Sequence, residues 1–389
     1  MKEPIYLDYN ATTPTDPEVT KAMAPFLADD FGNPASQGHS FGWKASYAVE
    51  KARKQLAALI GADAKQIVWT SGATESNNMV ILGRTWADTF EGKKPHLITT
   101  QVEHKCILEA FTQAEKFGAE VTVLPVDSDG RVQPDTLKAA IKPNTVLASF
   151  ILVNNEIGSI NPIKELSAIC HEHNILVHTD AAQAVGKIEI DVNDMGIDLM
   201  SMSGHKMYGP KGIGALFVKN PKVKLVPLIV GGQQESGLRS GTLNVPGIVG
   251  FGKAADLASD HLTEESERLT QLRTLLLDEL NRCGCQYKIN GSMQHRVAGN
   301  ISLCFGDIGT DLLTLKLQGI AVSSSSACSS GSVTGSYVLS SLGLSPTEAR
   351  STIRIGIGRF TQREDILAAA KIIAAAFGPD DLSQQDQNA

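Results

Sequence analysis

The stretch from about residue 65 to residue 220 alternates short apolar, β-branched runs with segments of helical pattern. Such alternation is typical of an α/β unit in which helices cover a mostly parallel sheet. The seven runs expected to form strands are 67–70, 97–100, 121–126, 146–153, 175–179, 199–202 and 215–218. We therefore expect an α/β fold before any single residue is interpreted.

Polar residues whose side chains can take part in binding or catalysis follow five of these runs, at the point where each strand should end. They are Ser71-Gly72-Ala73-Thr74, Glu103-His104-Lys105, Asn154-Asn155-Glu156, Asp180-Ala181-Ala182-Gln183 and Ser203-Gly204-His205-Lys206. Ligands of open α/β sheets bind just beyond the carboxyl ends of the strands. Five such groups in register predict one shared site at that edge.

The length of 389 residues exceeds the size at which a single hydrophobic core stops growing, so we expect two domains. The pattern predicts a large domain over residues 15–258 and a small α+β domain over residues 259–389, joined by the N-terminal segment 1–14. A charged helical pattern over residues 254–280 is a plausible bridge between them. The small domain should contain strands near 300–304 and 352–357, and a helix near 363–376.

The net charge of −7 argues against nucleic acid or an anionic membrane surface as the main partner. No window approaches the roughly 18 uninterrupted apolar residues of a membrane span. The N-terminus has neither a signal-peptide nor a transit-peptide pattern. Six cysteines without regular spacing do not form a disulfide framework, so we expect a cytoplasmic protein. The alternative is a mature organellar form whose transit peptide has been removed.

Lys206 follows a buried apolar run and sits between Gly-rich turns. A lysine held there can lose its proton and form a Schiff base, which is how enzymes hold carbonyl cofactors such as pyridoxal phosphate. The alternative is a surface lysine in a loop. Asp180 ends another apolar run, where a carboxylate needs a cationic partner such as a protonated pyridinium nitrogen. Its alternative role is an ordinary helix N-cap.

The segment from Ser71 to Asn77 follows a strand and opens a predicted helix. Hydroxyls and free N–H groups at a helix N-terminus, here around Ala73 and Thr74, bind phosphate, although an ordinary N-cap has the same appearance. Ser203 and His205 could supply further donors. His104 could stack on a cofactor ring or move protons, whereas most loop histidines are simply solvated.

Cys328 lies in the Ser/Gly-rich stretch 323–332. A catalytic thiol must reach its target as a thiolate and then present its product elsewhere, and a flexible segment suits both tasks. The alternative, an exposed linker cysteine, is an oxidation liability. Cys106, Cys170 and Cys304 lie in apolar patterns and are expected to be core residues.

Arg354 falls on the face of a predicted strand opposite its isoleucine neighbours, where it could clamp a substrate carboxylate. Arg239 is the other candidate anion contact. We expect no metal site. His171 and His173 would point in different directions from a helix, and Cys283-Gly284-Cys285 lacks a second ligand pair.

Together these residues make the chain resemble the cysteine desulfurases of the NifS/IscS type, within the class V aminotransferase family. The stretches that carry the resemblance are Tyr6-Leu7-Asp8-Tyr9-Asn10-Ala11-Thr12-Thr13-Pro14, Gly32-Asn33-Pro34, Gly72-Ala73-Thr74-Glu75-Ser76-Asn77-Asn78, Glu103-His104-Lys105, Asn154-Asn155-Glu156-Ile157-Gly158, His178-Thr179-Asp180-Ala181-Ala182-Gln183, Ser203-Gly204-His205-Lys206, Arg239-Ser240-Gly241-Thr242, Ser326-Ala327-Cys328 and Arg354.

The resemblance implies a fold type I homodimer that binds pyridoxal 5'-phosphate in its large domain. The roles it implies are Lys206 as the Schiff-base lysine, Asp180 on the ring nitrogen, Gln183 on the ring hydroxyl, His104 over the ring, Thr74, Ser203 and His205 on the phosphate, Thr242 reaching the phosphate from the other subunit, and Asn155 and Arg354 on the substrate carboxylate.

The implied reaction removes sulfur from L-cysteine, releases L-alanine and leaves a persulfide on Cys328. Lys206 would take the α-proton, and an iron–sulfur scaffold or a sulfur-relay protein, for example in tRNA thiolation, would receive the sulfur. A selenocysteine lyase or another class V aminotransferase is the alternative enzyme, and an aminotransferase would not need Cys328. A second alternative is an assembly partner that binds the cofactor without turnover.

Overall fold

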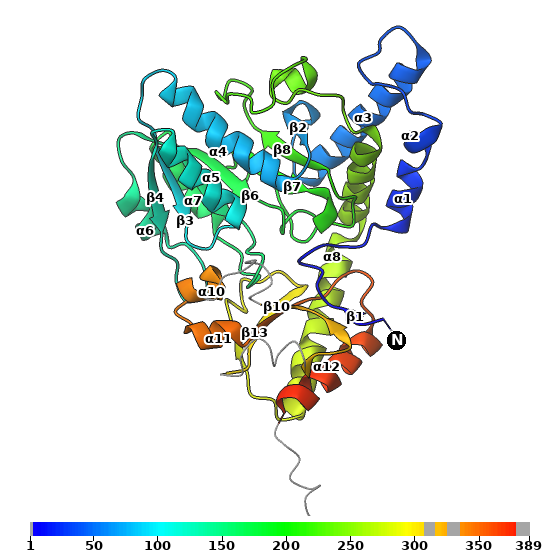
Figure 1. The fold of residues 1–389 in the computed structure, drawn as a ribbon, viewed down its shortest axis with the longest axis vertical. Helices are drawn as coiled ribbons and strands as arrows, with labels where there is room; N and C mark the ends of the chain where they lie inside the picture. The colour runs from blue at the N-terminus through cyan, green and yellow to red at the C-terminus, as the bar shows by residue number, and fades with distance from the viewer. Residues whose placement is uncertain (1–2, 307–315, 325–334, 379–389) are drawn as a thin grey trace, which may run out of the picture.

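The computed structural model describes residues 3–306, 316–324 and 335–378, and its larger part is built on a seven-stranded sheet (Figure 1). The strand order is β2-β8-β7-β6-β5-β3-β4, and only β8 runs antiparallel to its neighbours. The strands are β2 (Ile67–Thr70), β3 (His96–Thr100), β4 (Glu120–Leu124), β5 (Thr145–Ile151), β6 (Leu176–Asp180), β7 (Leu199–Ser203) and β8 (Gly214–Val218). All seven predicted strands are present, and the predicted α/β fold class is confirmed.

Helices cover both faces of this sheet. They and the short turns of this part are α1 (Pro17–Met23), α2 (Pro25–Ala28), α3 (Ser40–Leu59), η1 (Ala64–Gln66), α4 (Ala73–Thr89), α5 (Lys105–Lys116), α6 (Pro134–Ala140), α7 (Ile163–Glu172), η2 (Gly204–Lys206), η3 (Gln234–Gly237) and the first half of α8 (Val245–Arg282). Successive strand residues point to opposite faces, so Val68 packs with α4 and α5 while Trp69 packs with α3 and α8. Burial on both faces explains the nearly continuous apolar runs of the sequence.

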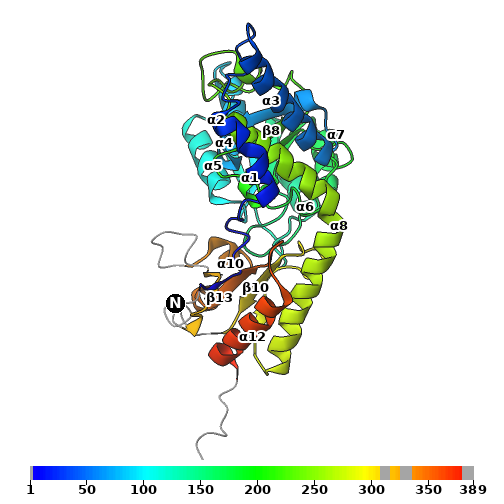
Figure 2. The ribbon, with the colours of Figure 1, turned by 90° about the vertical axis from the view of Figure 1, so that its right-hand side faces the viewer.

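The smaller part contains an antiparallel sheet of order β12-β13-β10-β9 (Figure 2). Its elements are β9 (Lys288–Ile289), β10 (Asn300–Cys304), β12 (Ser323–Ser324), α10 (Tyr337–Ser341), α11 (Pro346–Arg350), β13 (Thr352–Gly356) and α12 (Arg363–Phe377). Ile353 and Ile355 pack in its core with α12 and the second half of α8. The strands and the helix predicted here are present, within a few residues of the expected ends.

Two connections run between the parts. The N-terminal strand β1 (Ile5–Tyr6) pairs in parallel with β11 (Ile320–Ala321), beside the small sheet. Helix α8 runs from the large part into the small part, along the right-hand side of Figure 2, with Ala258 in the large core and Leu269 in the small one. The predicted boundary at residues 258–259 falls between these two contacts, inside the helix, and the domain division stays a prediction. No helix in the described ranges is long and apolar enough to cross a membrane.

Helices α3 and α8 approach closely because Gly252 faces the backbone of Ala52. A Cβ atom built on Gly252 would lie 2.5 Å from the Ala52 Cα and 2.6 Å from its Cβ. Neither atom belongs to a flexible side-chain end that could swing away. The helices can therefore keep this spacing only with glycine at position 252.

The Gly252→Ala variant should be destabilised by about 1–3 kcal/mol, because the extra methyl group would push two helices apart in a packed core. Urea unfolding monitored by circular dichroism would measure the loss. Gly38→Ala is the matched control, since a Cβ there would meet nothing within 4 Å. Equal stability of the two variants would contradict the close packing of α3 on α8.

Candidate active site

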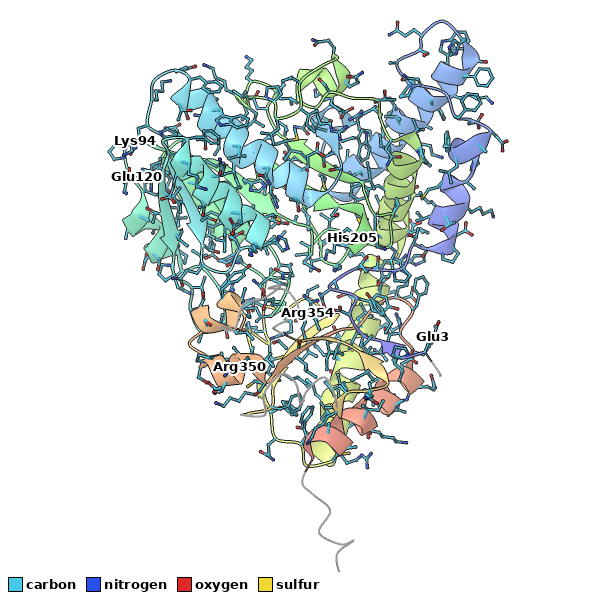
Figure 3. The ribbon with its side chains drawn as sticks, viewed as in Figure 1. Glu3, Lys94, Glu120, His205, Arg350 and Arg354 are labelled. Atoms are coloured by element: carbon cyan, nitrogen blue, oxygen red, sulfur yellow. The ribbon has the colours of Figure 1, made fainter. Side chains whose placement is uncertain are left out.

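A cavity of about 790 Å³ lies where the two parts of the molecule meet. In Figure 3 His205 marks its upper wall and Arg354 its lower wall. The predicted site residues that line it are Ala73, Thr74, His104, Asn155, Asp180, Gln183, Ser203, His205, Lys206 and Arg354. The carboxyl ends of neighbouring strands of the large sheet share one edge, which brings the residues from Ala73 to Lys206 together here, and the small sheet adds Arg354.

Lys206 enters the cavity from the short turn η2, which follows β7 directly. Its ammonium donates to the carbonyl oxygens of Asn10 at 2.8 Å and Ala11 at 2.7 Å. The turn needs glycine at position 209, because a Cβ there would lie 2.8 Å from the carbonyl oxygen of Gly204. Lys206 is therefore held by a sterically restricted turn and is not a solvated surface lysine.

Asp180 is the last residue of β6 and is only 3% exposed. Its carboxylate accepts from the side-chain amide of Asn77 at 2.8 Å and from the backbone N–H of Ala182 at 2.9 Å. Both donors are neutral, so the buried negative charge retains a strong preference for a cation. The contact with Ala182 closes a turn after β6. No helix begins at this point, so Asp180 is not a helix N-cap.

The opposite end of the cavity is formed by the first turn of α4. The helix begins after Gly72, which makes no side-chain cap, and Thr74 lies inside the first turn. Thr74 is therefore not the N-cap. The N–H groups of this turn line the cavity, where they and the helix dipole favour an anion.

His205 lies across the cavity from this turn and shares a hydrogen bond of 3.1 Å with the hydroxyl of Thr12. Burial, aided by the positive charge of Lys206, lowers the pKa of His205 to about 4. Its imidazole is therefore neutral at physiological pH and offers hydrogen bonding without charge.

His104 caps helix α5, with Nδ1 accepting from the backbone N–H of Cys106 at 3.3 Å. Desolvation lowers the pKa of His104, and the charge of Lys206 acts in the same direction against that of Asp180. The neutral ring lines the cavity. His104 was correctly predicted as a site residue from its position after a strand end, and not from its residue type.

Cys106 was expected in the core, and this expectation is wrong. It is half-buried and lines the cavity, with Sγ 3.0 Å from the His104 ring and 3.2 Å from the Asn77 amide nitrogen. It lies in the first turn of α5, whose N-terminus meets the cavity, so an apolar pattern did not imply burial. Burial raises the pKa of its thiol to about 11, which keeps it neutral. Cys170 and Cys304 are buried as predicted.

Arg354 projects from β13 and is 6% exposed. Its guanidinium donates to the Asn155 carbonyl at 2.9 Å, to Asp8 at 2.8 Å and to the hydroxyl of Ser323 at 2.8 Å. The Nε atom of Arg354 and the Oδ1 atom of Asn155 are both buried without a hydrogen-bond partner among the described residues. Both residues line the cavity, so each has unused hydrogen-bonding capacity next to the space where a polar ligand could bind.

Several cavity residues were missed by the sequence reasoning as candidates. Asp8, Asn10 and Ser323 line the cavity, and Asn77 lies behind Asp180. The first three come from the N-terminal segment and the edge of the small sheet, which tertiary packing brings to the site. The motif 6–14 was the available signal, but it gave no role to its members.

Two other predicted residues, Thr242 and Arg239, do not line this cavity. Thr242 is exposed outside it, and Arg239 instead pairs with Glu75, at 2.8 Å. Cys328 lies outside the described residues. Within the described ranges, no group of three or more His, Cys, Asp or Glu side chains is arranged to hold a metal ion.

An amine, a buried carboxylate with neutral partners and an uncapped helix N-terminus in one cavity fit the amine-reactive carbonyl, the ring nitrogen and the phosphate of pyridoxal phosphate. The fold and this site define a fold type I pyridoxal phosphate enzyme. Residues 5–368 match the family described as Aminotransferase class-V. The chain belongs to this family, and the resemblance inferred from its motifs is confirmed.

Similar proteins share nearly the whole chain. The cysteine desulfurase IscS of Anaeromyxobacter sp. is 48% identical over 96% of this chain and 92% of its own length. The mitochondrial cysteine desulfurase of Arthroderma benhamiae is 51% identical over 93% of this chain and 72% of its own length. A solved NifS-like protein superposes with a TM-score of 0.88 at 35% identity, covering 96% of this chain and 98% of its own. A structure of SspA in complex with cysteine has a TM-score of 0.81 at 39% identity, with coverage of 92% and 99%.

His178 supports the strand that ends in Asp180. Its ring is fully buried between the hydroxyls of Ser149 on β5, at 2.8 Å, and Ser201 on β7, at 3.0 Å. Burial lowers the pKa of His178 to about 3, so the folded protein holds the ring neutral. The ring therefore joins the three central strands at the edge where the site lies.

The free energy of unfolding should fall between pH 7 and pH 5, because His178 takes up a proton only when the chain unfolds. With a pKa of about 3 folded and about 6.5 unfolded, this single residue should account for about 2 kcal/mol of the loss. In urea unfolding, the free energy of unfolding of His178→Asn should differ between pH 7 and pH 5 by about 2 kcal/mol less than that of the parent. His261→Asn, at an exposed position, is the control. An unchanged pH dependence in His178→Asn would contradict the assignment.

Proposed function

We propose that this chain is a pyridoxal phosphate-dependent cysteine desulfurase that converts L-cysteine to L-alanine and carries the sulfur as a persulfide on Cys328. The observation that carries the proposal is one cavity that unites Lys206, Asp180, the α4 N-terminus and Arg354. Relatives at 48% and 51% identity are cysteine desulfurases, and a similar solved protein is in complex with cysteine.

Bound pyridoxal phosphate supplies an electron sink that stabilises negative charge at the α-carbon of an amino acid. Asp180 keeps the ring nitrogen protonated, since a buried carboxylate with two neutral partners favours a cation beside it. Gln183 would hold the ring hydroxyl, and His104 would pack against the ring. Lys206 takes the α-proton of cysteine and later returns a proton, because its amine lies on the same cavity wall.

The first turn of α4 would hold the phosphate. Ala73 and Thr74 contribute N–H groups and a hydroxyl, and Ser203 and His205 add donors from the opposite wall. The neutral state of His205 suits a hydrogen-bond donor. Thr242 completes the phosphate contacts of the other subunit, which agrees with its exposed position outside its own cavity.

Asn155 and Arg354 hold the substrate carboxylate. Each has a buried polar atom without a partner among the described residues, and guanidinium groups bind carboxylates in preferred geometry.

Cys328 accepts the sulfur. Its thiolate forms an S–S bond to the substrate sulfur while the substrate C–S bond breaks, and the α-amino acid product takes up protons to leave as alanine. Ser324, which precedes Cys328 by four residues, lies beside Arg354 in a small cavity at the edge of the active site. Four residues span at most about 14 Å, so the chain length allows the thiol to reach the substrate.

The Cys328→Ser variant should bind pyridoxal phosphate and cysteine but form no alanine, because no thiolate accepts the sulfur. Absorbance spectroscopy would follow the cofactor, and amino-acid analysis would follow alanine. Lys206→Ala serves as the contrasting variant, since it should lose the visible absorbance of the bound cofactor. Undiminished alanine production by Cys328→Ser would remove Cys328 from the chemistry.

Large apolar side chains at one end of the molecule support a homodimer. They lie on α2, on α3 and in the turn between them, at the upper right of Figure 1. Their exposed fractions are 68% for Leu27, 69% for Phe31, 48% for Phe41, 60% for Trp43 and 74% for Tyr47. A cluster of this kind marks an interface, and the second subunit is the partner that would also bring Thr242.

The Phe31→Glu variant should weaken self-association, because a carboxylate would be buried in the apolar interface. Sedimentation velocity should detect monomers in this variant at concentrations where the parent is dimeric. Phe90→Glu is the matched control, since Phe90 is 74% exposed on another surface at the end of α4. A dimer of unchanged strength in Phe31→Glu would exclude this surface as the interface.

The persulfide passes to a protein acceptor, either an iron–sulfur scaffold or a sulfur-relay protein, with no direct contact to nucleic acid or membrane. The IscS relatives support a desulfurase that feeds cluster assembly. We place the enzyme in the cytoplasm. The five cysteines that the structure describes are all free thiols, which agrees with a reducing compartment.

A further inference from the structure

Lys187 lies behind Gln183, on the far side from the cofactor cavity. It lines a second, smaller cavity of about 30 Å³ together with Tyr9, Tyr208 and Glu265. This second cavity separates the active-site wall from helix α8. The lysine is therefore close to the site but does not line the cofactor cavity.

A short chain of hydrogen bonds joins Lys187 to Lys206. The Lys187 ammonium donates to Oε1 of Gln183 at 2.8 Å, and Nε2 of Gln183 donates to the Asn10 carbonyl at 2.7 Å. That same carbonyl accepts from Lys206 at 2.8 Å. An ammonium only donates and a carbonyl only accepts, so the Gln183 amide has one orientation. Its second amide hydrogen remains for the cofactor cavity that Gln183 lines.

The surroundings of Lys187 disfavour its charge. In the ranges that the structure describes, no carboxylate lies within ion-pair distance of it, and Glu265 on α8 is engaged by Arg359 at 2.8 Å. Lys206 and Arg354 repel it from the active-site side, Glu265 attracts it, and Tyr9 and Tyr208 face it across the small cavity. Burial first, and then these cations, lower the pKa of Lys187 to about 7. An ammonium held by an amide in such a place costs folding free energy.

We propose that Lys187 is a positioning residue for the cofactor, which fixes the Gln183 amide with its N–H toward the ring and adds positive charge behind the ring hydroxyl. The proposal rests on the proposed function in that Gln183 meets that hydroxyl. A positive charge there favours the ionised ring oxygen and the deprotonated form of the bound chromophore. The negative charge of that oxygen in turn keeps Lys187 protonated above the pKa of about 7 that its protein surroundings alone give it. Lys187 acts through Gln183 and does not touch the reacting atoms.

The test is a pH titration of the visible absorbance of the holoenzyme between about pH 5 and pH 10. Lys187→Met should raise the midpoint by about one pH unit, a tenfold change in the proton dissociation constant, because the nearby positive charge is lost. Lys187→Arg, which keeps a cation, should stay within about 0.3 unit of the parent. Lys164→Met, which removes an exposed lysine paired with Asp194, should leave the midpoint unchanged. An equal midpoint in Lys187→Met and the parent, or no midpoint in either, would overturn the proposal.

Thermal unfolding separates this role from a structural one. Lys187→Met should unfold at the same temperature as the parent or a higher one, because a buried amine is removed. A lower unfolding temperature without a shifted titration would assign Lys187 to the fold instead. The titration needs only bound cofactor, so alanine formation by Cys328→Ser would refute the desulfurase mechanism and leave the Lys187 result standing. Absence of any cofactor absorbance in the parent would refute both.

Discussion

The active site depends on how the N-terminal segment is held between the two parts of the molecule. The carbonyl of Asn10 accepts from both Gln183 and Lys206, which belong to the large part. Two residues earlier, Asp8 accepts from Arg354 of the small sheet. One short segment, through the Asn10 carbonyl and the Asp8 carboxylate, thus links the large part to the small sheet. Without it, the carboxyl edge of the large sheet would be a half-site.

The charges around the cavity follow from this arrangement. The cofactor cavity is lined by the cations Lys206, Lys211 and Arg354 and by the carboxylates Asp8, Glu75 and Asp180. Asp8 and Glu75 are paired with Arg354 and Arg239. The histidines stay neutral because they are desolvated and face lysines. The cavity therefore presents localised positive charge to an anionic amino acid and a phosphate. The carboxylate of Asp180 has only neutral hydrogen-bond donors and remains available to a cation.

Much of this site could be inferred from the chain because strand periodicity and strand ends are local properties. The run before Asp180 and the glycine-rich turn around Lys206 each predict where a strand ends. A parallel sheet then brings those ends together. Cys106 was wrongly predicted to be a core residue, because an apolar pattern in the first turn of a helix indicates burial only when another element covers that turn. Asp8 and Ser323 were not predicted as site residues because their contacts depend on how the two parts pack.

The sequence by itself determined the α/β class, the strands and the residues at their carboxyl ends, because side-chain alternation and turn chemistry act over a few residues. It also indicated the pyridoxal phosphate family, because a lysine, a carboxylate and a phosphate-binding helix start at neighbouring strand ends are rarely combined in other kinds of site. Only the tertiary structure decided that Asn10 links Gln183 with Lys206, and that Lys187 lies behind them. Those contacts join residues that are up to 196 positions apart. Burial and neighbouring charge, which set the pKa of such groups, exist only once the chain has folded.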